Sequence, residues 1–275
     1  MDTLNFATQI ARQTGKLLLA HYRRSGIRAS LKADHTVVTE ADLAADCLIR
    51  QAIREHYPDD GLLSEEEGTI YPAGKSAVWI VDPLDGTTNF SLGMHYWGIS
   101  IARLVDGEPD TAALYFPLLD ELFTASRGGG AYLNGSRLEV KPPAPDQASQ
   151  RVSESASRPN PGQAMFVFSC CSRTHANYKV SIRYKTRILG SAAYGLCTVA
   201  RGSAVLAFEV TPKVWDFCGS WLVTREAGGV IRVLDGGTPF PLIPGTDYEG
   251  MSYPILAAAT PELWAEGQGK IIPKT

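Results

Sequence analysis

Two aspartates break one strongly apolar segment of this 275-residue sequence. The segment WIVDPLDGTTNF begins at Trp79, and its apolar start ends at Asp82 and Asp85, three residues apart. A buried carboxylate is costly unless a positive species pairs with it. Two carboxylates on one turn, together with the carbonyl of Leu84, offer the hard oxygen ligands that Mg²⁺ or Mn²⁺ prefers. The turn therefore predicts a divalent metal site, although Asp-Pro and Asp-Gly also occur in plain structural turns.

The residues that follow predict an anion site on the same turn. Gly86 precedes Thr87 and Thr88, where a short helix is expected to start. A helix start leaves backbone N–H groups without helical partners, and these groups bind phosphate well. Thr87 adds a hydroxyl. Metal ligands beside a phosphate cradle are the combination that phosphate ester hydrolysis requires.

Two further acidic positions could join this turn. Glu65 and Glu66 lie in SEEEG after the apolar GLL, and a strand there could pair with AVWIVD and bring both acids to the same sheet edge. The alternative is a solvated acidic turn. Asp216, in VWDFCGSW, stands at an expected helix start, where a capping role is the alternative.

Composition limits the classes of protein that remain. The hydrophobic content of 44% supports one large domain or two joined lobes. With 26 basic and 29 acidic residues the net charge is -3, so no nucleic acid partner is expected. The five cysteines form no CxxC pair, which favours a reducing cytoplasm over a disulfide framework. No apolar run reaches membrane-spanning length, so no membrane partner is expected.

The expected elements alternate along the chain. A helix is predicted over 3–23, and a second one after Thr39, with an apolar face that consists of Leu43, Cys47, Leu48, Ala52 and Ile53. Residues 97–140 predict antiparallel strands, with hairpins at Asp106-Gly107 and Asn134-Gly135. The Pro- and Ser-rich stretch 141–163 predicts a linker. Strands and helices alternate after it. The prediction is an α/β or α+β protein with an N-terminal lobe over 1–145 and a C-terminal lobe over 146–275.

Taken together, these segments resemble one family. SEEEG, WIVDPLDGTTNF and VWDFCGSWLVTREAGGVI, in this order, are similar to the motifs of the inositol monophosphatase family. LKADHTVVTEAD, ILGSAA and Glu209, seven residues before Asp216, agree with it, so the resemblance covers nearly the whole chain. The resemblance implies Mg²⁺-dependent, lithium-sensitive phosphomonoesterase activity. It also implies the layered α/β/α/β/α sandwich of inositol monophosphatase and fructose-1,6-bisphosphatase, and a homodimer.

The resemblance further implies a role for each site residue. Two or three Mg²⁺ ions, with Mn²⁺ as a substitute, would be held by Glu65, Asp82, Leu84, Asp85 and Asp216. The attacking water would be activated by four residues, namely Glu65, Glu66, Asp82 and Thr87. The substrate would contact Asp85, Gly86, Thr87, Gly190, Ser191, Ala192, Glu209 and Asp216.

Departures from the family pattern fall in the second half and leave the substrate open. The 141–163 linker is long, the 173–187 segment is short, and Cys171 stands near a position where relatives often carry a hydroxyl. The predicted reaction is hydrolysis of a polyol or sugar phosphate, first of all inositol 1-phosphate. The alternatives are a histidinol-phosphate phosphatase, a non-catalytic metal-binding member, and a fructose-1,6-bisphosphatase. In the last case a second phosphate would contact His175, Lys179, Arg183 and Lys185.

Overall fold

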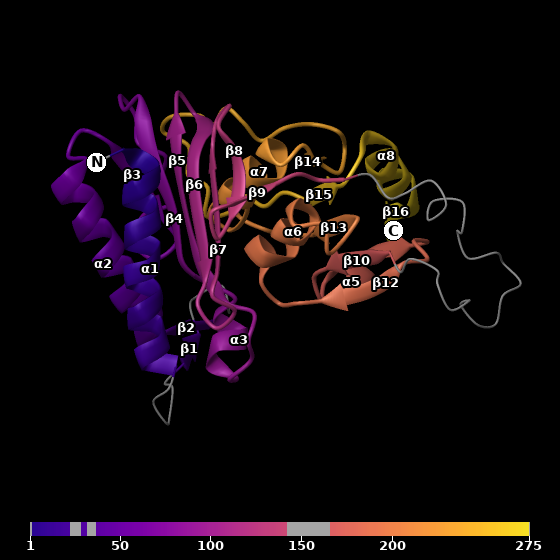
Figure 1. The fold of residues 1–275 in the computed structure, drawn as a ribbon, viewed down its shortest axis with the longest axis horizontal. Coiled ribbons are helices and arrows are strands. Elements are labelled where there is room, and N and C mark those ends of the chain that lie inside the picture. Colours follow the sequence, from indigo (N-terminus) through magenta and orange to yellow (C-terminus); the bar gives the residue numbers. More distant parts are fainter. Residues whose placement is uncertain (1, 23–28, 32–36, 142–165, 275) are drawn as a thin grey trace, which may run out of the picture.

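Two large β-sheets with helices on their faces organise the chain in the computed structural model (Figure 1). The structure describes residues 2–22, 29–31, 37–141 and 166–274. No helix among these residues combines the length and the apolar character that a membrane crossing requires. The predicted boundary between the lobes, at 145/146, and nearly all of the predicted linker lie outside the described residues.

The first sheet carries the predicted metal turn. Its strand order is β3-β4-β5-β6-β7-β8-β9, and β3 is parallel to β4, whereas the later neighbours are antiparallel. The strands are β3 (Gly61–Ser64), β4 (Ala77–Asp85), β5 (Gly98–Val105), β6 (Glu108–Phe116), β7 (Glu121–Ser126), β8 (Gly130–Leu133) and β9 (Ser136–Leu138). All nine residues of β4 are buried. The predicted antiparallel region and the strand AVWIVD are confirmed.

Both predicted hairpins turn through left-handed backbone. Asp106 and Gly107 have φ values of 52° and 78°, and Asn134 and Gly135 have values of 49° and 80°. Two successive positive φ values match the twist of antiparallel strands, and Asp-Gly and Asn-Gly adopt them at low cost.

Two helices cover the outer face of the first sheet. They are α1 (Thr3–Tyr22), which packs on β5 and β6, and α2 (Glu40–His56), which packs on β4. Thr39 caps α2 as predicted, in a capping box with Asp42. The predicted apolar face of α2 is wrong in part, because Cys47 is exposed and Leu43 is 53% exposed.

The true buried face of α2 includes two acids. Ala41, Ala45, Ile49 and Ile53 follow one another at intervals of four residues and are buried. Asp42 and Asp46 are buried on the same face. Each acid is hydrogen-bonded, Asp42 to Thr39 and Asp46 to Ser64 and Arg50, which makes its burial tolerable. A pattern of apolar residues alone does not reveal a face that contains satisfied carboxylates.

The second sheet belongs to the C-terminal half. Its strand order is β12-β10-β13-β15-β14, in which β10 is parallel to both β12 and β13, and β15 is antiparallel to both of its neighbours. The strands are β10 (Val167–Cys170), β12 (Lys185–Ile188), β13 (Leu206–Glu209), β14 (Val230–Val233) and β15 (Ile255–Ala258).

Helices between and beyond the sheets complete five layers. α6 (Ala192–Ala200) and α7 (Val214–Glu226) pack on each other between the sheets, α7 against β5 and β6 and α6 against β13. α8 (Pro261–Lys270) packs on β13, β14 and β15. Figure 1 shows the resulting order of helices, sheet, helices, sheet and helix. This is the α/β/α/β/α sandwich that the resemblance implies.

Six short elements complete the described chain. They are the antiparallel pair β1 (Ala29–Leu31) and β2 (Val37–Thr39), the helices α3 (Thr87–Ser91) and α5 (Thr174–Asn177), and the antiparallel pair β11 (Tyr178–Val180) and β16 (Ile271–Pro273). The helix α3 confirms the predicted helix start after Gly86.

Candidate metal and phosphate site

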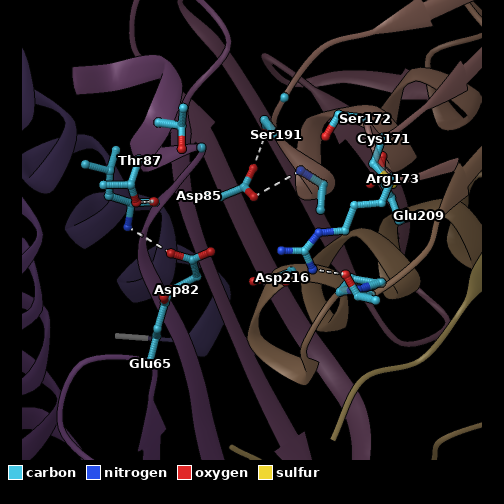
Figure 2. Close-up of a pocket in the computed structure, with 17 residues that line it drawn as sticks. Glu65, Asp82, Asp85, Thr87, Cys171, Ser172, Arg173, Ser191, Glu209 and Asp216 are labelled. Atoms are coloured by element: carbon cyan, nitrogen blue, oxygen red, sulfur yellow. Dashed lines mark hydrogen bonds between the residues drawn. The ribbon is translucent and has the colours of Figure 1, made fainter. Parts of the chain in front are cut away.

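Three carboxylates from three elements meet at one edge of the first sheet. Because β3 is parallel to β4 with Ser64 opposite Val81, Glu65 emerges beside Asp82, and the Glu65 N–H donates to the Val81 carbonyl at 3.2 Å. Asp216 comes from the first turn of α7. Oxygen atoms of Glu65, Asp82 and Asp216 all lie within 4.8 Å of one another, and Figure 2 shows the three side chains around one space.

Asp216 also stabilises the start of its own helix. Its carboxylate accepts a hydrogen bond from the Lys213 N–H at 2.8 Å, so the capping role considered from the sequence is real. Capping does not displace the side chain from the cluster, because a carboxylate can accept several hydrogen bonds. Both interpretations of Asp216 therefore hold together.

A cavity of about 370 Å³ contains this cluster. It is lined by every predicted site residue except Glu66, and by six more: Thr88, Cys171, Ser172, Arg173, Thr211 and Pro212. The predicted residues come from both halves of the chain, since Gly190 to Ala192 and Glu209 face the turn at Asp82 to Thr87 across the cavity (Figure 2). Glu66 lies outside this lining.

The charge balance of the cluster calls for a cation. Asp82 is only 1% exposed. Burial, and then repulsion by Glu65, raise the pKa of Asp82 well above its usual value, and the same two causes raise the pKa of Asp216. Neither aspartate forms an ion pair with a described residue. Buried carboxylates of this kind are paired or bind metals. An all-oxygen set of donors suits Mg²⁺, so the residues fit the metal that the resemblance implies.

Contacts within the turn at Asp82 to Thr87 fix its backbone. The Leu84 N–H donates to Asp82 at 2.9 Å, and the Leu84 carbonyl oxygen lies 3.0 Å from the Thr87 hydroxyl oxygen. Gly86 has a φ of 86°, and a Cβ there would lie 2.8 Å from the Tyr96 carbonyl oxygen. The position therefore requires glycine for both its conformation and its space. Asp82, Leu84 and Thr87 are thereby held on one wall of the cavity.

The sequence analysis missed Asp42 as a site residue. The Thr87 hydroxyl lies 3.0 Å from the Asp42 carboxylate, which is 1% exposed. Burial raises the pKa of Asp42 to about 6, against the hydrogen bonds from Thr39 and Thr87 that lower it. The sequence does contain the pair of Thr39 and Asp42 at the start of α2. This spacing is typical of a helix cap, and it predicts a stabilising role and not a catalytic one.

Asp85 connects the turn to the C-terminal half. Its carboxylate accepts hydrogen bonds from the Ser191 hydroxyl and from the Ala192 N–H, the latter at 3.1 Å. Ser191 also caps α6 through the Tyr194 N–H at 3.1 Å. The structure does not include Asp85 in the cluster of three carboxylates. Its predicted role as a ligand of a second metal stays a prediction.

The wall opposite the turn carries a buried acid, Glu209, and a cation, Arg173. Glu209 is buried, and burial, followed by the nearby Cys171 thiol, raises its pKa well above the usual value. Arg173 is the one lysine or arginine among the described residues of the lining. It donates to the Thr211 hydroxyl at 2.6 Å, and Figure 2 shows it extending into the cavity.

The basic segment proposed for a second phosphate does not reach this cavity. None of His175, Lys179, Arg183 and Lys185 is among the described residues that line it. Lys179 lies on β11, and Lys185 lies on β12 at the edge of the second sheet. Arg173, which was not predicted from the sequence, is the lysine or arginine that lines the cavity among the described residues.

Comparison with known proteins settles the family. The family model described as the inositol monophosphatase family matches residues 2–273. The chain belongs to the inositol monophosphatase family. Its curated relatives include the Nus factor SuhB of Pasteurella multocida, 34% identical over 98% of this chain and 96% of the relative. The Nus factor SuhB of Escherichia coli K12 is 35% identical over 85% of this chain and 86% of the relative.

Solved structures agree with this membership. The extragenic suppressor protein suhB of Bartonella henselae has a TM-score of 0.78 and 28% identity, covering 97% of this chain and 96% of that one. The IMPase of Thermotoga maritima has a TM-score of 0.76 and 28% identity, covering 98% of this chain and 97% of that one. The layered sandwich is thus the fold of this family. Phosphatases of the inositol monophosphatase type are the structural neighbours of this member.

Proposed function

We propose that this inositol monophosphatase family member hydrolyses a phosphate monoester of a polyol or sugar with Mg²⁺, and that inositol 1-phosphate is its first candidate substrate. The observation that carries the proposal is the cluster of Glu65, Asp82 and Asp216, which lines one cavity together with Thr87, while Asp42 lies behind Thr87 at 3.0 Å from its hydroxyl. A metal site and a proton acceptor next to it are the two requirements for attack by water on a phosphate ester.

The metal supplies charge that the chain lacks at this point. Glu65, Asp82 and Asp216, with the Leu84 carbonyl and Asp85 as further ligands, would hold divalent ions. When bound, such ions would supply the charge that lowers the pKa of a water molecule, neutralises the phosphate and stabilises the leaving alkoxide. Mg²⁺, with Mn²⁺ as a substitute, fits the oxygen donors. Two or three ions per site and inhibition by lithium are part of the proposal and rest on the family resemblance.

The Thr87–Asp42 pair takes up the proton of the attacking water. The Thr87 hydroxyl donates to Asp42, so its oxygen is oriented to accept a hydrogen bond from water. As the water is deprotonated, its proton moves to Thr87 Oγ1 and the threonine proton moves to Asp42 Oδ1. Asp42 has a pKa of about 6, close to the range in which a general base works well. Neither Asp42 nor Glu66 lines the cavity, but Asp42 reaches it through Thr87, which does. The predicted water-activating roles of Glu65, Glu66 and Asp82 stay predictions.

The remaining lining residues orient the substrate. The N–H groups of Gly86 and Thr87 lie at the start of α3 and would bind the phosphate. Ser191 and Ala192 face the alcohol part of the ester from the loop before α6, and Glu209 faces it from β13. Burial raises the pKa of Glu209 well above its usual value, and its carboxyl group would hydrogen-bond to a polyol hydroxyl. Arg173 adds one positive charge for an anionic substrate.

The experiment that tests this function is phosphate release from four substrates, with added Mg²⁺ and with EDTA. The substrates are inositol 1-phosphate, fructose 1,6-bisphosphate, histidinol phosphate and adenosine 3′,5′-bisphosphate. We expect phosphate release from inositol 1-phosphate to be the highest of the four, and we expect EDTA to abolish it. A preference for fructose 1,6-bisphosphate would keep the mechanism and change the substrate.

A second candidate function is regulatory. The curated relatives are named Nus factor, and a family member without turnover is an alternative that the sequence left open. The presence of the cluster and of Thr87 in one cavity, with Asp42 behind Thr87, favours the catalytic role. No phosphate release from any of the four substrates would favour the regulatory one. We further propose a cytoplasmic homodimer, on the basis of the cysteine usage and the family resemblance.

A further inference from the structure

Asn89 joins two segments of the site that are 100 residues apart in the chain. Its side-chain amide donates to the Leu189 carbonyl at 2.7 Å and to the Tyr96 carbonyl at 2.6 Å. The residue is 5% exposed and does not line the cavity. Both N–H groups of one amide are therefore used to hold backbone carbonyls, one of which begins the loop over Leu189 to Ala192.

The Asn89 side chain is closely packed against the loop, so a larger residue at Gly190 would collide with it. Gly190 has a φ of 78°, and a Cβ there would lie 2.7 Å from the Asn89 side-chain oxygen. A Cβ on Gly86 would lie 3.3 Å from the Gly190 carbonyl oxygen and 3.4 Å from the Ser191 Cβ. The phosphate turn and the loop at 189–192 are thus in direct backbone contact, with the Asn89 amide fitted between them.

This contact sets the distance between the two parts of the substrate. The turn at Asp82 to Thr87 holds the phosphate side of the cavity, while Ser191 and Ala192 hold the alcohol side. Asp85 makes a second connection, but it also belongs to the candidate ligands and the substrate contacts. Asn89 neither lines the cavity nor belongs to the metal cluster, so it acts on the site through the two carbonyls that it holds, that of Leu189 in the loop and that of Tyr96 beside Gly86.

We propose that Asn89 is a positioning residue that makes this site select polyol and sugar phosphates over esters with other leaving groups. The proposal rests on the proposed phosphatase function and adds a residue that determines its specificity. Without the amide, the 189–192 loop loses its fixed distance from the phosphate turn. A misplacement of about 1 Å costs roughly 100-fold in rate for groups that depend on it. Esters whose alcohol makes no use of the loop are not affected.

The test compares Asn89→Ala with wild type on two substrates, inositol 1-phosphate and p-nitrophenyl phosphate, with saturating Mg²⁺. Asn89→Ala is expected to lower kcat/KM for inositol 1-phosphate by about 100-fold and to leave that for p-nitrophenyl phosphate within about threefold. Asn89→Ser keeps one hydrogen-bond donor and is expected to show a smaller decrease in kcat/KM for inositol 1-phosphate, again without a decrease for p-nitrophenyl phosphate. It takes the place of Asn89→Ala if that variant does not fold.

The matched control is Asn134→Ala. Asn134 also ties backbone segments with its amide, since it donates to the Asp120 carbonyl at 2.8 Å and accepts from the Leu122 N–H at 2.9 Å. It lies in the β8–β9 hairpin and not in the lining of the cavity. A general loss of stability would affect both variants alike. Only Asn89→Ala is expected to change the ratio of kcat/KM between the two substrates.

Equal losses on both substrates, or no loss on either, would overturn the proposal. Turnover of neither substrate by the wild type would instead contradict the proposed function. The role of Asn89 is then decided by calorimetric titration of inositol 1-phosphate and phenyl phosphate with Mg²⁺. Weaker binding of inositol 1-phosphate alone in Asn89→Ala supports the proposal, and equal changes overturn it.

Discussion

The Thr87 hydroxyl lies 3.0 Å from the buried carboxylate of Asp42, a residue 45 positions earlier in the chain. Thr87 begins α3 at the phosphate turn, and Asp42 lies in the first turn of α2. The same carboxylate accepts hydrogen bonds from the Thr39 N–H at 2.8 Å and from the Thr39 hydroxyl at 2.5 Å. A helix cap on the outer layer thus places a proton acceptor next to the metal cluster of this inositol monophosphatase family member.

Replacing Asp42 should separate catalysis from stability. Asp42→Asn keeps the shape of the side chain but removes the proton acceptor, so kcat should fall by about 100-fold or more. The buried charge is lost with it, and the melting temperature at neutral pH should therefore not fall. Glu40→Gln, an exposed carboxylate in the same helical turn, is the control and should retain kcat. Full turnover by Asp42→Asn would remove Asp42 from the mechanism.

Arg173 should affect substrate binding more than the chemical step. Arg173→Gln removes the one lysine or arginine of the described cavity lining, so KM for phosphate esters should rise by roughly tenfold while kcat changes little. Lys185→Gln removes an exposed positive charge from β12 and should leave KM unchanged. The measurement is the KM for inositol 1-phosphate and for fructose 1,6-bisphosphate. A larger effect of Lys185→Gln on the bisphosphate would restore the basic segment as a second phosphate site.

The metal-free protein should become less stable as the pH rises. The pKa values of Asp42 and Asp85 are about 6 in the folded protein, above their ordinary value of 3.8. Between these values the folded state binds more protons than the unfolded state, so stability is greatest at low pH and is lost as pH rises through about 6. In EDTA, the free energy of unfolding should fall by roughly 1–3 kcal/mol between about pH 5 and pH 7.

Urea unfolding at each pH measures this slope. Asp42→Asn should make the slope shallower, because one of the two titrating groups is gone. Added Mg²⁺ should also reduce the slope, because a bound cation favours the ionised carboxylates. Stability that rises steadily with pH in EDTA would contradict the account of the buried acids.

The sequence predicted the parts of the molecule that local pattern determines. The buried strand β4, the DPLDGTT turn, the hairpins and the helix starts after Thr39 and Gly86 all depend on neighbouring residues. Glu65 could be placed beside Asp82 because a parallel strand pair brings the ends of both strands to one edge. These inferences needed only spacing and residue type.

The missed residues depend on contacts that are distant in the sequence. Asp42 lies on a helix face that was not expected to be buried, and its burial is tolerable because Thr39 and Thr87 donate to it. Asn89 owes its role to a carbonyl 100 residues away. Arg173 belongs to the segment that follows β10, where the sequence shows several cations and no pattern to choose among them.

Binding of Mn²⁺ to the metal-free protein tests the central claim most directly. Calorimetric titration of wild type, Asp82→Asn and the exposed control Glu40→Gln, with phosphate release measured on the same samples, connects the cluster to the reaction. The account predicts that wild type and Glu40→Gln bind the metal and release phosphate, and that Asp82→Asn, still folded, does neither. Equal binding and full turnover in Asp82→Asn would show that the cluster of Glu65, Asp82 and Asp216 is not the metal centre.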